Sequence, residues 1–509
     1  MSKIMLMRGF LTSCPGVSPL TACSIGVGLA AAVALAPALP ATAATAPAGS
    51  AVPGGTRSLP LVPLARERVL GTAPEQGLYR TGLERFALLG VVWDDPGTEL
   101  RGRVQVRTRS AATGEWSGWQ DVETHTADHG ADPGATEGSA RRVRGGTAPL
   151  WVGESDGVDV RVQAEGAGGA SGKRAGVPRP LPAGLRLELV DPGKDGGDGG
   201  GGGDTGVADA VDADEAGEAL EAQEAKEAKA RETKEAGEAG ERVPEPLPAD
   251  DPPRTALDTE AAIAASGANA DITEFGATAI PELDRKATEL ELGRLQGTTL
   301  DDSSRGKPYI GPRPRIVTRR GWGADESLRE RGFVYTKKVK AAFVHHTASG
   351  NKYTCAQAPS VIRGIYRYHV KSMGWRDIGY NFLVDKCGTL YEGRAGGVAK
   401  AVLGAHTLGF NTNSMGIAVI GTYASSKPSG SAVTAVARLT AWKLGLYGAN
   451  PLGKTYLTSG GGNLYPKGKN VRLNVISGHR DGFATECPGK RLYAKLGTVR
   501  SSAATYQGR

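Results

Sequence analysis

The chain lacks a strong charge of either sign, and it has no long apolar run beyond its N-terminal region. Lys and Arg number 61 against 54 Asp and Glu; the net charge of +7 is small for 509 residues and does not by itself suggest a nucleic-acid partner. The lack of further apolar runs excludes a multi-span membrane protein. Hydrophobic residues make up only 39%, whereas 74 Gly and 30 Pro form about a fifth of the chain. This composition predicts two or three folded domains separated by unstructured segments.

Residues 1–44 have the features of an export signal. Basic residues precede an Ala-rich apolar stretch over 25–39, and residues 41–43 match a cleavage site of the A-x-A type. The stretch is short for a bilayer span and prolines interrupt its end, which favours cleavage over a membrane anchor. A lipoprotein-type box ends at Cys23, but the apolar run follows that cysteine instead of preceding it. We therefore expect a secreted protein with no integral membrane segment after cleavage.

Cysteine is also scarce. Removal of the signal would leave only Cys355, Cys387 and Cys487. Because three is an odd number, one thiol in an oxidising compartment needs a partner other than an internal disulfide.

Residues 59–192 contain short strand-like segments separated by turn signals. The segment 85–94 is largely apolar, and residues 104–108 and 185–190 alternate between apolar and polar side chains. This pattern predicts an all-β module, a sandwich or a barrel. Its tryptophans are candidates for sugar contacts, but buried core aromatics are the commoner case, and the sequence does not reveal what this module does.

Residues 193–307 predict a disordered, low-complexity linker. A tract of Gly and Asp over 194–206 leads into an Ala-, Glu- and Lys-rich segment over 208–242, and residues 243–253 are rich in Pro. Almost no apolar stripe runs through these segments, so they cannot build a core.

From residue 315 to 509 the pattern changes to mixed strands and helices. Strands are predicted at 339–345, 380–385 and 415–420, and residues 356–373 place apolar side chains on one helix face. The expected fold is an α/β domain with a mixed central sheet flanked by helices.

Three residues of this domain are candidate zinc ligands. His345 ends a predicted strand, and His479 and Cys487 lie in a loop that leaves another strand. Imidazole nitrogen and thiolate sulfur are ligands that zinc prefers, and three protein ligands plus a water make a catalytic site. A metal-bound Cys487 would also explain the odd thiol. Spacing alone is a weak signal and leaves an ordinary hydrogen-bonded role open for each histidine.

Short motifs follow one another through the domain. In chain order they are RRGWGA at 319–324, FVHHTA at 343–348, GWRDIGYNFLV at 374–384, LYEGR at 390–394, GAH at 404–406, GHRD at 478–481 and TECPG at 485–489. This ordered series resembles the peptidoglycan recognition proteins and the zinc amidases of the type-2 N-acetylmuramoyl-L-alanine amidase family. It covers only the last two-fifths of the chain.

The resemblance implies a role for each of five residues. His345, His479 and Cys487 would hold Zn²⁺, Tyr380 would stabilise the transition state, and Thr485 would line the site. Some relatives carry lysine at the position of Thr485.

Other polar residues near these motifs have two interpretations. His406 and Asn411 either contact substrate in the groove or support their loop. We interpret His346 as structural, because consecutive strand residues point to opposite faces, and His369 and Trp375 as core residues.

The function that the resemblance implies is a secreted, cell-wall-associated zinc hydrolase. It would cleave the amide bond between N-acetylmuramic acid and L-alanine in peptidoglycan, and we expect a monomer whose partner is peptidoglycan and not nucleic acid. The alternative is a non-catalytic recognition module, in which the third ligand is lost; the presence of Cys487 and Tyr380 favours catalysis. A cysteine hydrolase with Cys487 as nucleophile and His479 as base leaves His345 and the ordered motifs unexplained.

Two further expectations follow. With Cys487 assigned to zinc, Cys355 and Cys387 remain as the only available pair, and we expect a disulfide between them. Relatives often carry a disulfide near the first position but with a closer second cysteine. We also expect a fragment from about residue 310 to fold and act without the β-module, since the linker cannot form a shared core.

Overall fold

The structure, a computed structural model, describes residues 54–64, 74–124, 129–132, 134–135, 143–165, 180–193, 257, 259–297 and 308–509. The predicted signal over 1–44 and the Gly/Asp-rich and Ala/Glu-rich tracts of the predicted linker lie outside these residues. The described residues belong to one compact unit. Within the described ranges, no helix has both the length and the apolar character needed to cross a bilayer.

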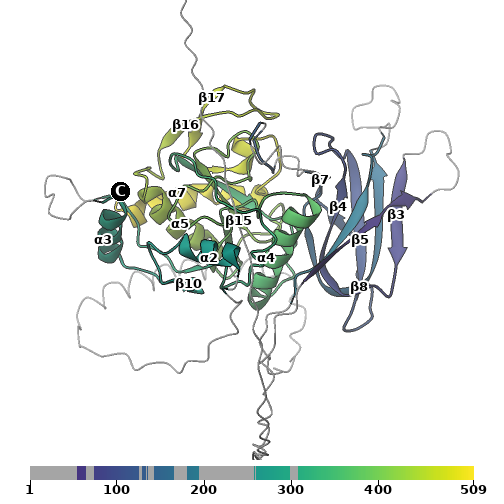
Figure 1. The fold of residues 1–509 in the computed structure, drawn as a ribbon. Helices are drawn as coiled ribbons and strands as arrows, with labels where there is room; N and C mark the ends of the chain where they lie inside the picture. Colours follow the sequence, from purple (N-terminus) through teal and green to yellow (C-terminus); the bar gives the residue numbers. More distant parts are fainter. Residues whose placement is uncertain are drawn as a thin grey trace, which may run out of the picture. The chain divides into compact units, whose positions relative to one another are not determined.

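The predicted all-β module is confirmed (Figure 1, purple to blue). Its described strands form one sheet in the order β1-β9-β4-β8-β3-β2, with β5 beside β8, β6 beside β5 and β7 beside β4. Every pairing is antiparallel. The strands are β1 (Gly55–Pro60), β2 (Val62–Pro63), β3 (Glu75–Arg80), β4 (Phe86–Trp93), β5 (Gly102–Ser110), β6 (Gln120–Val122), β7 (Gly145–Gly146), β8 (Leu150–Ala164) and β9 (Arg186–Asp191).

Strand β4 is buried along its whole length. Phe86 and Leu89 belong to the core of the β-module, whereas Leu88 and Val92 belong to a second core that includes residues after 320. A strand buried on both faces needs no polar alternation, which explains the nearly continuous apolar run in this segment.

The C-terminal domain is built on a seven-stranded sheet in the order β10-β11-β14-β13-β15-β12-β18. The pairs β10/β11 and β13/β14 are antiparallel, and the other four pairs are parallel. The predicted mixed sheet is therefore confirmed. The strands are β10 (Ala279–Ile280), β11 (Ile316–Val317), β12 (Ala341–His346), β13 (Phe382–Val384), β14 (Leu390–Glu392), β15 (Ser414–Val419) and β18 (Ile476–Gly478), beside a separate hairpin of β16 (Lys454–Thr458) and β17 (Asn470–Asn474).

Helices cover both faces of this sheet (Figure 1). One core joins α5 and α7 to Ile417 and Val419 of β15, and the other joins α4 to Leu383 and Ala418. The predicted helix at 356–373 is present as α4, which continues as the wider turn η2. The helices and turns are α2 (Glu260–Gly267), α3 (Arg285–Leu295), η1 (Cys355–Gln357), α4 (Ala358–Arg367), η2 (Tyr368–Ser372), α5 (Gly430–Gly445), η3 (His479–Asp481), α6 (Lys490–Ala494) and α7 (Leu496–Gln507).

The predicted linker extends too far toward the C-terminus. Residues 259–297 contain α2, β10 and α3, and β10 pairs with β11 at the edge of the sheet. Ile280 and Leu292 are buried in the domain core. Asn269 Nδ2 lies 3.0 Å from both carboxylate oxygens of Glu392 in β14. The apolar residues of this segment lie among many charged and polar residues, which hid them in the sequence.

The β-module and the C-terminal domain share a buried core. Leu88 and Trp151 of the β-module belong to the same buried cluster as Ile362 and Ile365 of α4. A Cβ added to Gly364 of α4 would lie 3.1 Å from Leu88 Cδ1, so the strand and the helix approach closely. This apolar contact is called the anchor below.

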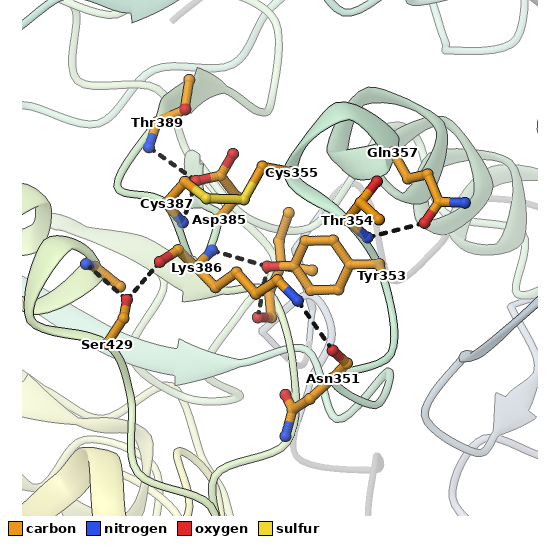
Figure 2. The surroundings of a disulfide bond; sticks show 12 residues. Asn351, Tyr353, Thr354, Cys355, Gln357, Asp385, Lys386, Cys387, Thr389 and Ser429 are labelled. Carbon is orange, nitrogen blue, oxygen red and sulfur yellow. Dashed lines mark hydrogen bonds between the residues drawn. A yellow bond between two sulfur atoms is a disulfide. The ribbon is translucent and has the colours of Figure 1, made fainter. Parts of the chain in front are cut away.

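The expected disulfide between Cys355 and Cys387 is present. It joins η1 to the turn between β13 and β14, and Figure 2 shows the hydrogen bonds that hold this turn. Asp385 Oδ1 accepts from the backbone N–H groups of Cys387 and Thr389, both at 2.9 Å. The backbone N–H of Lys386 donates to the Tyr353 hydroxyl at 2.8 Å.

Candidate metal centre

The three predicted ligands meet at one edge of the sheet. His345 lies near the end of β12, and His479 follows β18 directly. These strands are neighbours and run parallel, so their ends deliver both imidazoles to the same place. Cys487 lies in the loop after η3, and its Sγ is 3.8 Å from His345 Nδ1. All three side chains are buried.

A fourth residue, His129, joins them from the β-module. His129 lies in the connection between β6 and β7, and its ring centroid is 4.6 Å from that of His479 and 5.3 Å from that of His345. One ligand atom from each of these four residues lies within 4.8 Å of the others. Sequence reasoning missed His129, because it lies far before the first family motif and nothing in its local sequence marks it.

The donor set and its environment fit a zinc ion. Tetrahedral zinc with bonds of about 2.0–2.3 Å keeps its ligand atoms about 3.5 Å apart, so small side-chain adjustments suffice. Burial, and then the nearby imidazoles of His479 and His406, lower the pKa of His345 well below its ordinary value. His345 is therefore neutral at physiological pH, the form in which imidazole binds a metal.

Thr407 orients one of the ligands, and sequence reasoning missed it. Its Oγ1 lies 3.4 Å from His345 Nε2 and 3.0 Å from His406 Nδ1. Since Nε2 of His345 is engaged by Thr407, its Nδ1 faces Cys487. Partners of this kind fix the ring orientation of metal ligands. In the sequence, the position of Thr407 directly after the GAH motif was the only signal of this role.

The two predicted catalytic residues lie beside the cluster. Tyr380 is buried, and its ring centroid is 5.6 Å from that of His345. Thr485 is half-buried, and its Oγ1 accepts from the backbone N–H of Cys487 at 3.2 Å. Thr485 thus positions the loop that carries the thiol.

His406 and Asn411 are both buried. Asn411 Oδ1 accepts from the backbone N–H groups of His406 and Thr407 at 2.7 and 3.0 Å, which ties their loop together. Asn411 Nδ2 donates to Gly130 O and to Asp132 Oδ1 of the β-module at 2.8 and 2.7 Å. Here Asn411 supports its loop; a contact with substrate stays a prediction.

The other histidines and the tryptophan have structural contacts. His346 Nδ1 accepts from the backbone N–H of Tyr423 at 3.2 Å. His369 Nδ1 accepts from the backbone N–H of Gly379 at 3.3 Å, and its ring lies 4.4 Å from that of Trp375. These three side chains are buried, in agreement with their structural interpretation.

An α/β domain with buried histidine and cysteine side chains grouped at a sheet edge has a possible metal site, and comparisons with known proteins narrow the class of protein. Residues 335–490 match the N-acetylmuramoyl-L-alanine amidase family, and residues 40–181 match the family described as Rv3811 N-terminal galactose-binding domain-like. The C-terminal domain belongs to the family of peptidoglycan recognition proteins and type-2 amidases. This membership supports peptidoglycan binding or amidase activity.

Two curated relatives agree with this assignment. The chain is 29% identical over 183 residues to peptidoglycan-recognition protein SC2 of Drosophila simulans, spanning 36% of this chain and 85% of the relative. It is 36% identical over 126 residues to peptidoglycan-recognition protein LE of Drosophila melanogaster, spanning 25% and 35% respectively. A solved structure of peptidoglycan recognition protein-LE in complex with tracheal cytotoxin is 30% identical and covers 36% of this chain and 92% of that chain, with a TM-score of 0.28.

Proposed function

We propose that the protein is a secreted zinc-dependent amidase that hydrolyses the bond between N-acetylmuramic acid and L-alanine in peptidoglycan. The observation that carries this proposal is the convergence of His345, His479 and Cys487, whose ligand atoms belong to a cluster within 4.8 Å of one another. A recognition module has no need of a buried thiol beside two imidazoles. The third ligand is present here, and Tyr380 lies next to it.

Each residue of the site has its own role in the proposed hydrolysis. His345, His479 and Cys487 would hold Zn²⁺, which would polarise the scissile carbonyl and make hydroxide available near neutral pH. The Tyr380 hydroxyl donates a hydrogen bond to the oxyanion that forms when the carbonyl becomes tetrahedral. Thr407 keeps the His345 ring in place, and Thr485 fixes the backbone of Cys487. The buried surroundings strengthen each of these polar contacts.

Export agrees with the disulfide. A bridge between Cys355 and Cys387 forms and persists in an oxidising compartment, as found outside the cytoplasm. Appearance of the full chain, shortened near residue 44, in the culture medium or cell-wall fraction would support export. Full-length protein confined to the cytoplasm would contradict it.

The function is tested with purified full chain and soluble muropeptides. We expect about one zinc per chain, and products that are a free muramyl lactyl carboxyl group and a peptide beginning with L-alanine, identified by mass spectrometry. Dialysis against a chelator should stop the reaction, and return of Zn²⁺ should restore it. Binding of muropeptide without any cleavage, in zinc-loaded protein, would favour the recognition module instead.

A further inference from the structure

A short segment of the β-module, residues 129–132, lies against the catalytic domain beside the candidate ligand cluster; we call it the plug. Asp132 Oδ1 accepts from the backbone N–H of Gly409 at 2.8 Å and from Asn411 Nδ2 at 2.7 Å. Gly130 O accepts a second hydrogen bond from Asn411 Nδ2. A Cβ added to Gly460 would lie 3.3 Å from Asp132 Cβ, so the plug sits close against this part of the domain. These contacts are specific and numerous for so short a segment.

The donors that converge on Asp132 suit a carboxylate. A backbone N–H and a side-chain amide both point at one carboxylate oxygen. Stem peptides of peptidoglycan carry carboxylates of their own, which would compete for the same donors. The donors that hold Asp132 would therefore also suit an anionic group of the substrate.

The other end of the plug reaches the ligand cluster. The His129 ring lies between those of His479, at 4.6 Å, and Tyr380, at 5.7 Å, and its nitrogen is one of the four clustered ligand atoms. Three histidines and one cysteine complete a tetrahedral zinc. Four protein ligands make a closed site, whereas a catalytic site keeps one position for water or substrate.

We propose that His129 is the fourth ligand of the metal centre and that the plug keeps the full chain in a latent form, in which the metal has no free position for substrate. Peptidoglycan must displace the plug before hydrolysis can begin. The catalytic consequence rests on the proposed function, whereas ligation by His129 does not. Asp132 and Gly130 accept hydrogen bonds from the catalytic domain, and each of these bonds can be exchanged for one with substrate or water at a small net cost.

Ligation is tested by zinc X-ray absorption on the full chain, which counts imidazole ligands from their scattering. We expect three imidazoles and one sulfur in the unaltered protein, and two imidazoles, one sulfur and an oxygen in His129→Ala. Zinc affinity should fall tenfold or more in that variant, since even indirect partners of metal ligands are worth about 10–100-fold. The control is Asp121→Ala on β6, whose carboxylate pairs with Arg103 at the surface. An unchanged ligand count in His129→Ala would overturn the proposal.

Latency is tested by initial rates on soluble muropeptides. If the form in which the plug is released makes up a tenth of the unaltered protein or less, His129→Ala and Asp132→Ala should each hydrolyse on the order of tenfold faster or more, and Asp121→Ala should not. Asp132→Ala keeps all four ligand residues and removes only the hydrogen bonds of the plug. It therefore separates release of the plug from loss of the His129 side chain. Equal rates in all four proteins would refute latency. A change in ligand count with no cleavage by any protein would support ligation and reject the proposed amidase.

Discussion

The β-module meets the catalytic domain at two places whose chemistry differs. The anchor is apolar: Leu88 and Trp151 are buried against Ile362 and its neighbours on α4. The plug is polar: Asp132 and Gly130 accept hydrogen bonds from the catalytic domain, and the His129 imidazole lies beside the other candidate metal ligands. Exposing apolar surface costs about 25 cal/mol per Å², with nothing in water to replace the contact, whereas hydrogen bonds have ready substitutes. The same module can therefore stay docked by one contact while it releases the other.

The largest effect is expected at the ligands themselves. His345→Ala, His479→Ala and Cys487→Ser should each weaken zinc binding and reduce hydrolysis below detection, because each removes a ligand that the catalytic form needs. Metal analysis and muropeptide assays check this, with His346→Asn as the matched control; its amide oxygen can still accept from Tyr423 N–H, and zinc should remain. A zinc-loaded, active Cys487→Ser would remove that residue from the ligand set.

Truncation at the anchor comes next. Leu88→Ala leaves a cavity against Gly364 and should lower the free energy of unfolding by about 2–5 kcal/mol. Urea unfolding measures the change, and zinc content should be unaffected because no ligand is touched. Val62→Ala in the same module is the control; this side chain is 52% exposed, and its loss should cost less than about 0.5 kcal/mol. Equal costs at the two positions would show that the anchor contributes no stability.

A third substitution separates the chemical step of hydrolysis from the blocking of the site by the plug. Tyr380→Phe should keep zinc and the fold but slow hydrolysis on the order of 100-fold, the size expected for one oxyanion donor. Combining it with His129→Ala sharpens the comparison, since release of the plug should raise the rate by the same factor whether or not the Tyr380 hydroxyl is present. An unchanged rate in Tyr380→Phe would assign Tyr380 to packing.

The smallest predicted effect lies away from both contacts. Burial raises the pKa of Glu392 to about 7, against hydrogen bonds from Asn269 and the nearby charge of Arg319, while Glu326 adds to the rise. Because the folded state holds this proton more tightly than the unfolded chain, its contribution to stability is full below about pH 4.5 and is lost as pH rises through 7. Glu392→Gln should reduce the fall in unfolding free energy between pH 5 and pH 8 on the order of 2 kcal/mol.

Urea titrations at several pH values measure this difference. Other titrating groups, including the metal ligands, are present in both proteins and cancel in the comparison. Glu99→Gln, at a surface ion pair with Arg101, is the control and should leave the pH profile unchanged. A parallel profile in Glu392→Gln would mean that Glu392 is ionised in the folded protein throughout this range.

The sequence predicted the parts of the site that depend on local patterns. The strand before His345, the turn at Cys387 and the motif around Cys487 are each recognisable within a few residues, and the odd number of thiols led to the disulfide. His129 was not predictable in this way, because its role depends on how the β-module docks and not on its neighbours in sequence. Thr407 was missed for a similar reason, since its contact with His345 joins two separate loops.

The apolar contact that we call the anchor could have been predicted from the sequence. The apolar run over 85–94 has no polar alternation, whereas a strand on the surface of a free module has one polar face. Such a run indicates burial on both sides and so a second domain against β4. The segment 259–297 gave less warning, because its apolar residues lie among many charged and polar ones, although its helices begin at the side-chain caps of Thr259 and Asp284.

The proton spectrum of the Co²⁺-loaded full chain tests the latent form most directly. Each ligating imidazole that keeps an N–H gives its own strongly shifted proton resonance, and the resonance of His129 is identified by its loss in His129→Ala. We predict that this resonance is present in the free protein and disappears when a non-hydrolysable muropeptide analogue is added, while the signals of the catalytic ligands remain. A spectrum that is identical in the unaltered protein and in His129→Ala would contradict ligation by His129 and the latent form built on it.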